Sequence, residues 1–242
     1  GSQVMMGVME EKTNRIAEVI ISSVKPFQLM LGKIIGVAAV GLTQLMIWLV
    51  LIITGLIVVS SFLSPETLNE AQSIQQAMTT VNQGGVASQI SSATDSFLSA
   101  NWGLILPVFL FYFLAGYLFY ASLFAAVGSV VNEDPQEAQA LMLPITMPII
   151  LSFIVMTSAI NNPESPIAVW GSMIPFSSPI VMMARLPSGG VPLWELLLSM
   201  ILLVAGFIFT TYLSAKIYRI GILLYGKKVT LREMGKWIFR KS

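Results

Sequence analysis

The sequence contains no cysteine and no histidine among its 242 residues. These absences exclude disulfide bonds, thiolate or imidazole metal ligands, a cysteine nucleophile, a catalytic Ser-His pair and the HExxH motif of zinc proteases. The two aspartates, Asp95 and Asp134, both lie in polar stretches, so an aspartyl protease dyad inside a membrane is excluded as well. We therefore do not expect this chain to be an enzyme by itself.

Charge is also scarce, because only 10% of the residues are charged while 55% are hydrophobic. A soluble domain has about 25% charged residues, so this chain cannot cover a surface that faces water. The composition predicts an integral membrane protein. No Walker A pattern is present, since Lys33, Lys227 and Lys236, which follow glycines, are not followed by Ser or Thr. If ATP is used, another chain hydrolyses it.

Four apolar segments are long enough to cross about 30 Å of hydrocarbon as helices. They cover residues 34–63, 102–131, 140–160 and 193–214. Residues 161–192 contain two apolar pieces that are too short to cross, Pro166–Ile174 and Ser178–Leu186, which predict re-entrant or interfacial helices. The expected fold class is an all-α, polytopic membrane protein with four transmembrane helices.

The basic residues predict the orientation. Twelve of the 13 Lys and Arg residues lie before Ile34 or after Ser214, and the remaining one is Arg185. Because basic residues concentrate on the cytoplasmic side and four spans bring both ends to one side, we expect both ends to be cytoplasmic. The polar stretch 64–101 is then an extracytoplasmic loop in a bacterial-type cytoplasmic membrane.

A charged stretch ahead of the first span has helical periodicity. Apolar and polar residues fall on two separate stripes: Ile16, Val19, Ile20 and Val24 on one, Glu11, Arg15, Glu18 and Ser22 on the other. We expect Glu11 and Arg15 to pair across one turn and Pro26 to end this helix. Two interpretations are open: a helix that a cytosolic partner pushes, or a solvated interfacial helix without a partner.

Three polar residues stand out near or inside the spans. Gln44 either hydrogen-bonds another helix or lines a pathway. Arg185 and Glu195 are predicted to pair at the membrane edge.

The connection before the third span has the pattern of a helix start. Asp134 is a predicted cap, Pro135 suits the first position, and Glu137 completes a capping box. In the alternative interpretation Glu133, Asp134 and Glu137 contact a cytosolic partner.

Three runs of the sequence resemble NatB-like ABC exporter permeases, which are type-2 ABC transporter membrane subunits. They are GSQVMMGVMEEKTNRIAEVIISSVKPFQLMLGKIIGVAAVGLTQLMIW, VNEDPQEAQALMLPITMP and IPFSSPIVMMARLPSGGVPLWE. Together they extend over nearly the whole chain, in the order found in that family. The family has an earlier span, a large extracytoplasmic domain and a second span before this point, so the resemblance implies the C-terminal portion of a permease.

The resemblance further implies an export permease that works as a dimer with separate nucleotide-binding ATPase subunits, by alternating access. ATP and magnesium would be bound by those subunits, with no cofactor in this chain and no nucleic-acid partner. By this analogy the ATPase contacts a coupling helix within residues 1–28, and Pro26 forms the elbow that leads into a permease domain of residues 29–225 and a basic cytoplasmic tail of residues 226–242. The implied contact residues are Glu10, Glu11, Thr13, Arg15 and Glu18.

Two alternatives to an ABC exporter are a secondary transporter or channel and a mechanical scaffold. A secondary transporter or channel needs ionisable groups near the membrane midplane, and the predicted spans have essentially none. An ATPase-driven membrane scaffold that transmits mechanical force without moving a substrate is also compatible. The substrate class stays open between sodium, drug, lipid and peptide, because the chain has no carboxylate cluster that argues for a cation.

Overall fold

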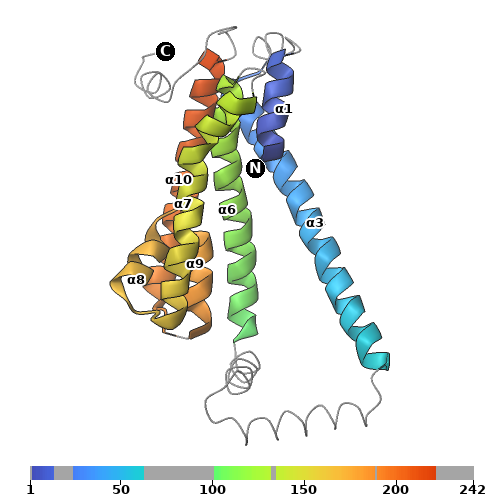
Figure 1. Cartoon of the computed structure of the whole chain (residues 1–242), viewed down its shortest axis with the longest axis vertical. Coiled ribbons are helices and arrows are strands. Elements are labelled where there is room, and N and C mark those ends of the chain that lie inside the picture. Colours follow the sequence, from blue (N-terminus) through green and yellow to red (C-terminus); the bar gives the residue numbers. More distant parts are fainter. Residues whose placement is uncertain (1, 14–23, 63–100, 132–134, 189, 222–242) are drawn as a thin grey trace, which may run out of the picture. The chain divides into compact units, whose positions relative to one another are not determined.

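The computed structural model describes residues 2–13, 24–62, 101–131, 135–188 and 190–221. Every regular element within these ranges is a helix (Figure 1). Four helical segments are long and apolar enough to cross a membrane, which confirms the predicted all-α, polytopic fold: Pro26–Gly55, Trp102–Val130, Gln139–Asn161 and Leu193–Arg219.

The described part of the chain contains four long helices and several shorter elements, three of which lie between the last two long helices. The long helices are α3 (Pro26–Phe62), α6 (Trp102–Val130), α7 (Pro135–Asn161) and α10 (Leu193–Gly221). The shorter elements are α1 (Ser2–Thr13), α8 (Pro166–Met173), α9 (Ser178–Arg185) and the 3-10 turn η1 (Leu186–Ser188).

The chain divides into two compact units, Gly41–Ile105 and the combination of Gly1–Val40 with Leu106–Ser242. In the first unit, α3 continues to Phe62 with exposed apolar side chains such as Trp48 and Ile52, as a helix in lipid requires. Gln44 is also exposed on this helix. Its predicted bond to another helix therefore stays a prediction.

The second unit is held together where several helix ends meet. Two clusters of buried side chains join α1 to the beginning of α3, the end of α6, the beginning of α7 and the end of α10. The first cluster includes Met5, Val127, Val130, Leu141 and Ile217, and the second includes Val4, Val8, Met30, Ile34, Ala121, Ala125, Ala215 and Tyr218. These ends therefore lie on the same side of the unit.

Helix α3 begins earlier than the predicted span. The sequence predicts a span that begins near Ile34, whereas Pro26 is the first residue of α3. The predicted end of a preceding helix at Pro26 stays a prediction, because residues 14–23 lie outside the described residues. Lys25 precedes it outside the helix and accepts the backbone N–H of Leu29 at 3.1 Å. Proline is well tolerated at a first helical position because its missing N–H has no partner there in any helix. The predicted segment 1–28 is thus divided between α1, residues 14–23 outside the described part, and α3.

Helix α7 begins where the sequence predicts, at Pro135. Pro135 is its first residue, and Glu137 belongs to its first turn. Glu133 and Asp134 lie outside the described residues, so the capping box and the alternative partner contact stay predictions. The helix continues through Pro144 and Pro148.

The two short helices α8 and α9 form a hairpin that lies against α7 and α10 (Figure 1). Ser165 caps α8 by accepting the N–H of Ala168 at 3.3 Å, and Pro166 occupies the first turn. The hairpin tip, Ile174–Ser177, reaches well inside the bundle, because Pro175 packs against Gly206 of α10. The predicted pair of short re-entrant helices is therefore present.

Hydroxyl groups satisfy the backbone around this tip. Tyr120 of α6 donates to the carbonyl of Phe176, and Ser199 of α10 donates to the carbonyl of Ser172 at 2.6 Å. The Phe176 ring stacks edge-on against Phe119, with 5.0 Å between ring centres. Non-helical backbone at membrane depth needs such internal partners because lipid offers none.

A close backbone approach between α1 and α6 yields a stability prediction. A Cβ at Gly128 of α6 would lie 2.6 Å from the carbonyl oxygen of Met5 in α1. Gly128→Ala is therefore expected to push α1 away and destabilise the protein by about 1–3 kcal/mol, which thermal unfolding in detergent measures. Gly32→Ala in α3 is the control, because nothing lies within 4 Å of its Cβ position. An equal unfolding temperature for both variants would contradict this packing.

Candidate functional site

Helix α1 presents one apolar face to the bundle. Val4, Val8 and Glu11 follow each other at spacings of four and three residues, which places them on one side of a helix. Val4 and Val8 are 3% and 0% exposed. Met6 and Glu10, which lie on other positions of the helix, are exposed. Val4 and Val8 therefore pack α1 against the bundle, and we call this apolar contact the valine seat. Glu11 lies on the same side of the helix.

Small residues make this seat possible. Val8 packs in a cluster with Ala121 and Ala125 of α6, and with Met30 and Ile34 of α3. Alanines leave room for a neighbouring helix to approach closely. Burying one valine side chain contributes about 1.5–3 kcal/mol, so the seat rather than any polar contact supplies most of the stability here.

The last turn of α1 carries a polar contact between three helices. The Glu11 carboxylate forms an ion pair with the Lys33 ammonium group of α3. The Tyr218 hydroxyl of α10 donates to the same carboxylate oxygen, Oε2, at 3.5 Å. Lys33 Nζ also lies 5.3 Å from the centre of the Tyr218 ring, within cation–π range. We call Glu11, Lys33 and Tyr218 the α1 junction.

The α1 junction is only partly shielded from solvent. The Lys33 and Glu11 side chains are 18% and 27% exposed. Ion pairs that water reaches contribute about 1 kcal/mol or less, because solvent screens them. The junction therefore matters more for the relative position of the three helices than for their stability.

The structure gives Glu11 two partners that the sequence did not indicate. Its carboxylate is directed to Lys33 of α3 and Tyr218 of α10. The predicted Glu11–Arg15 pair and the predicted contact of Glu11 with the ATPase stay predictions. Glu10 beside it is exposed, and Thr13 is the last residue of α1. Arg15 and Glu18 lie outside the described residues. Of the predicted contact residues with described side chains in α1, Glu10 alone faces outward.

Sequence reasoning missed Lys33 and Tyr218. A signal for Lys33 was present, because a lone ammonium group inside an apolar helix at the membrane edge requires a partner or a path to water. No comparable signal marks Tyr218, since a tyrosine near the end of a span is common. The contact joins residues 207 positions apart, which no local pattern encodes.

A second polar site lies at the base of the α8–α9 hairpin. Arg185 donates through Nε to the Pro163 carbonyl at 2.7 Å and through one terminal nitrogen to Ser172 Oγ at 2.6 Å. Its other terminal nitrogen lies 2.9 Å from Glu195 Oε2. The predicted Arg185–Glu195 ion pair is present, with side chains 2% and 9% exposed.

This arrangement fixes the hairpin to α10. All three guanidinium nitrogens have partners within the protein, and the charge-assisted bonds are stronger than neutral ones. No group of three or more acidic side chains with metal-binding geometry occurs among the described residues. The site therefore acts as a brace between the hairpin and α10.

Comparison with known proteins gives consistent results. A family model described as "ABC-2 family transporter protein" matches residues 1–216. The chain is 30% identical over 239 residues to the uncharacterized protein MJ1024 of Methanocaldococcus jannaschii, covering 98% of this chain and 49% of that protein. It is 30% identical over 233 residues to the uncharacterized protein YhaP of Bacillus subtilis, covering 96% of this chain and 50% of that protein. The chain thus spans about half the length of these curated relatives. No solved structure matches.

The buried ion pair gives a measurable prediction. Arg185→Leu removes two hydrogen bonds and the ion pair, and it leaves the Glu195 carboxylate buried without a counter-charge, so we expect a loss of about 3–5 kcal/mol in unfolding free energy. Glu195→Gln should cost less, because the arginine keeps its bonds to Pro163 and Ser172. Thermal unfolding in detergent compares the two variants.

The hydrogen bonds of Arg185 to Pro163 and Ser172 limit what charge reversal can restore. Exchanging the two charges at positions 185 and 195 should restore only part of the stability, since a carboxylate at position 185 cannot donate to the Pro163 carbonyl. A double mutant as stable as the original protein would show that these two additional bonds contribute nothing.

Proposed function

The chain belongs to the ABC-2 family of transporter proteins, and from this membership we propose that it is the permease subunit of an ATP-driven exporter of the NatB-like type. A permease component of an ABC transporter follows from the family match over residues 1–216. The direction of transport, the subtype and the coupling mechanism are our proposal. In it, the ATPase is a separate subunit that binds ATP and magnesium, and two permease copies assemble in the cytoplasmic membrane.

The α1 junction is the observation that carries the proposal. A transporter driven by another chain needs a segment that contacts this chain outside the membrane and passes movement into the spans. Helix α1 meets both needs, because Glu10 is exposed while Glu11 contacts α3 and α10. Its valine seat transmits displacement because packed interiors resist deformation.

Charge placement supports a cytoplasmic location for this end. The side of the unit where α1, α3, α6, α7 and α10 meet includes Lys33 and lies next to Lys216 and Arg219 of α10. The hairpin and its brace lie at the other ends of α7 and α10. We therefore place both ends of the chain in the cytoplasm and the hairpin toward the outside.

The proposed cycle is alternating access. Closure of two ATPase subunits displaces the segment that contains Glu10, Thr13, Arg15 and Glu18. The α1 junction transfers this displacement to α3, whose first residue is Pro26, and to α10. The bundle then opens to the outside, and ATP hydrolysis resets it.

A secondary transporter or channel is less well supported. In the described spans and hairpin, the buried charged side chains are Arg185 and Glu195, and they are paired with each other. Ion-coupled transport needs a group that exchanges partners during the cycle. The force-transmitting scaffold differs from the exporter only in moving no substrate, so transport into inverted vesicles separates the two.

Neighbouring glutamates provide a matched test of coupling. In the assembled transporter, Glu10→Arg should weaken copurification of the ATPase subunit, because this side chain faces outward. Glu11→Gln should leave copurification intact and lower substrate-stimulated ATPase turnover about fivefold, which corresponds to about 1 kcal/mol. Both variants should insert into the membrane normally.

The junction also predicts non-additive effects. Lys33→Gln and Glu11→Gln remove the same ion pair, so the double variant should lose little more turnover than either single variant. Fully additive losses of ATPase turnover, or unchanged turnover in Glu11→Gln, would show that the Glu11–Lys33 ion pair does not transmit movement from the ATPase to the spans. Failure of any ATPase to copurify with the unaltered full-length protein would remove the exporter proposal itself.

A further inference from the structure

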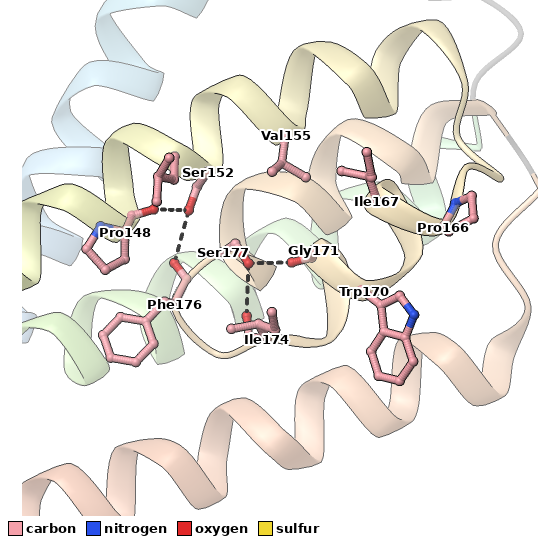
Figure 2. A pocket seen from close by; sticks show the side chains of 11 residues that line it. Pro148, Ser152, Val155, Pro166, Ile167, Trp170, Gly171, Ile174, Phe176 and Ser177 are labelled. Atoms are coloured by element: carbon pink, nitrogen blue, oxygen red, sulfur yellow. Dashed lines mark hydrogen bonds between the residues drawn. The ribbon is translucent and has the colours of Figure 1, made fainter.

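A pocket of about 570 Å³ lies between α7 and the α8–α9 hairpin. Figure 2 shows its two walls, with Pro148 and Ser152 on α7 and Ile167 and Trp170 on α8. The Phe176 carbonyl closes its inner end beside Ser152 (Figure 2). Its volume lies in the range of small-molecule sites, about 300–1,000 Å³.

The pocket exists because small residues line its floor and large ones its rim. Ser152, Gly171 and Ser177 are buried, and their small side chains do not fill the space between α7 and the hairpin. The rim side chains are exposed, with Leu151 at 58% and Trp170 at 70%. Such large apolar rim groups match a hydrocarbon environment, so the opening faces the interior of the bilayer or its edge.

One donor, the indole N–H of Trp170, belongs to the exposed rim, whereas the hydroxyl groups on the pocket floor are hydrogen-bonded within the protein. Ser152 Oγ donates to the Pro148 carbonyl at 2.6 Å, and Ser177 Oγ donates to the Gly171 carbonyl at 2.6 Å. No charged side chain lines it. Sites for polar or drug-sized ligands normally include a few convergent polar groups that fix orientation. The lining therefore fits a hydrocarbon chain.

The direction of the pocket points to one source of such a chain. Helix α7 passes from Pro148, deep in the bundle, toward its end at Asn161, and α8 returns from Pro166 toward the deep tip. The wall from Pro148 to Val155 is about 10 Å long at 1.5 Å per residue, parallel to a span. At the outer end, exposed Asn161 and Asn162 mark the polar region, and Trp170 is of the type that prefers membrane interfaces.

We propose that this pocket binds one acyl chain of a bilayer phospholipid, with its headgroup beside the connection between Asn161 and Pro166. The chain fills the space between α7 and the hairpin and contacts Leu151, Ile167 and Trp170. This lipid is a bound component of the folded protein, distinct from any transported substrate, and its site does not depend on the proposed export function.

Retention of lipid tests the proposal directly. The protein is reconstituted in bilayers that contain a phospholipid with a diazirine in the middle of its acyl chain, extracted into detergent and washed to remove loosely held lipid. Native mass spectrometry should then show a phospholipid retained on the protein. Illumination should attach it to Ile167 or Trp170, and not to Ile154, which is exposed on α7 outside the pocket.

A matched pair of variants locates the binding. Leu151→Trp places an indole in the pocket mouth and should abolish retention and cross-linking. Ile150→Trp adds the same group at a neighbouring position that is 55% exposed and outside the pocket, and it should retain the lipid. Circular dichroism and gel filtration check that both variants fold. If Leu151→Trp does not fold, the cross-linking positions in the unaltered protein decide.

Three results would overturn the proposal. They are absence of retained lipid in the unaltered protein, equal labelling of Ile154 and the pocket residues, and undiminished retention in folded Leu151→Trp. Retention of a molecule with a mass that matches no phospholipid would overturn it as well, since another occupant would then hold the pocket.

Discussion

The architecture depends on how the Glu11 carboxylate is satisfied at the edge of an apolar bundle. A charged group there needs a counter-charge or a path to water, and Glu11 has both, since Lys33 and Tyr218 contact it while its side chain stays 27% exposed. The valines before it fix α1 in place, so the carboxylate meets two spans in one arrangement. The end of α1 is thereby tied to the beginning of one span and the end of another.

The two ion pairs of the structure differ in burial, and this difference separates their roles. Arg185 and Glu195 are almost completely buried, and the guanidinium group has further partners in Pro163 and Ser172. Breaking such a pair leaves a buried charge, so it holds one geometry. The Glu11–Lys33 pair is reached by water, so it contributes less stability, and the buried valines Val4 and Val8 hold α1 against the bundle. One end of α10 is therefore fixed to the hairpin by a buried ion pair, and the other end is joined to α1 mainly by apolar packing.

Much of the fold was predictable because lipid imposes strict local rules. The lengths of the apolar segments predict four spans and two short helices. Pro135 and Pro166 predict where α7 and α8 begin. The Arg185–Glu195 pair was predictable because Arg185 is the one basic residue between the first and last spans and needs an acidic partner near the membrane edge. The start of α3 at Pro26, ahead of the predicted span at Ile34, was not predictable, because a proline can both end and begin a helix and the sequence does not show which.

The α1 junction was not predictable from local patterns. Glu11 suited a pair with Arg15 one turn away, and only the packing of three distant helices brings Lys33 and Tyr218 to the same carboxylate. Likewise, the pocket beside the hairpin depends on how closely α8 approaches α7 at Gly171, where an added Cβ would lie 2.5 Å from Val155. Such distances follow from tertiary packing of small residues, which periodicity does not encode.

The central claim is that α1 and the ends of α3 and α10 move as one body when the ATPase subunits close. Because these 242 residues contain no cysteine, introduced cysteines are the only sites in them for thiol-reactive spin labels. Labels at exposed Met6 and Ile35, and at Glu10 and Arg219, report the α1–α3 and α1–α10 distances in the assembled transporter. Pulsed electron paramagnetic resonance should give the same distance distributions without nucleotide and with trapped ATP. A shift of either distance between the two states would contradict the account, because α1 would then move without carrying the spans.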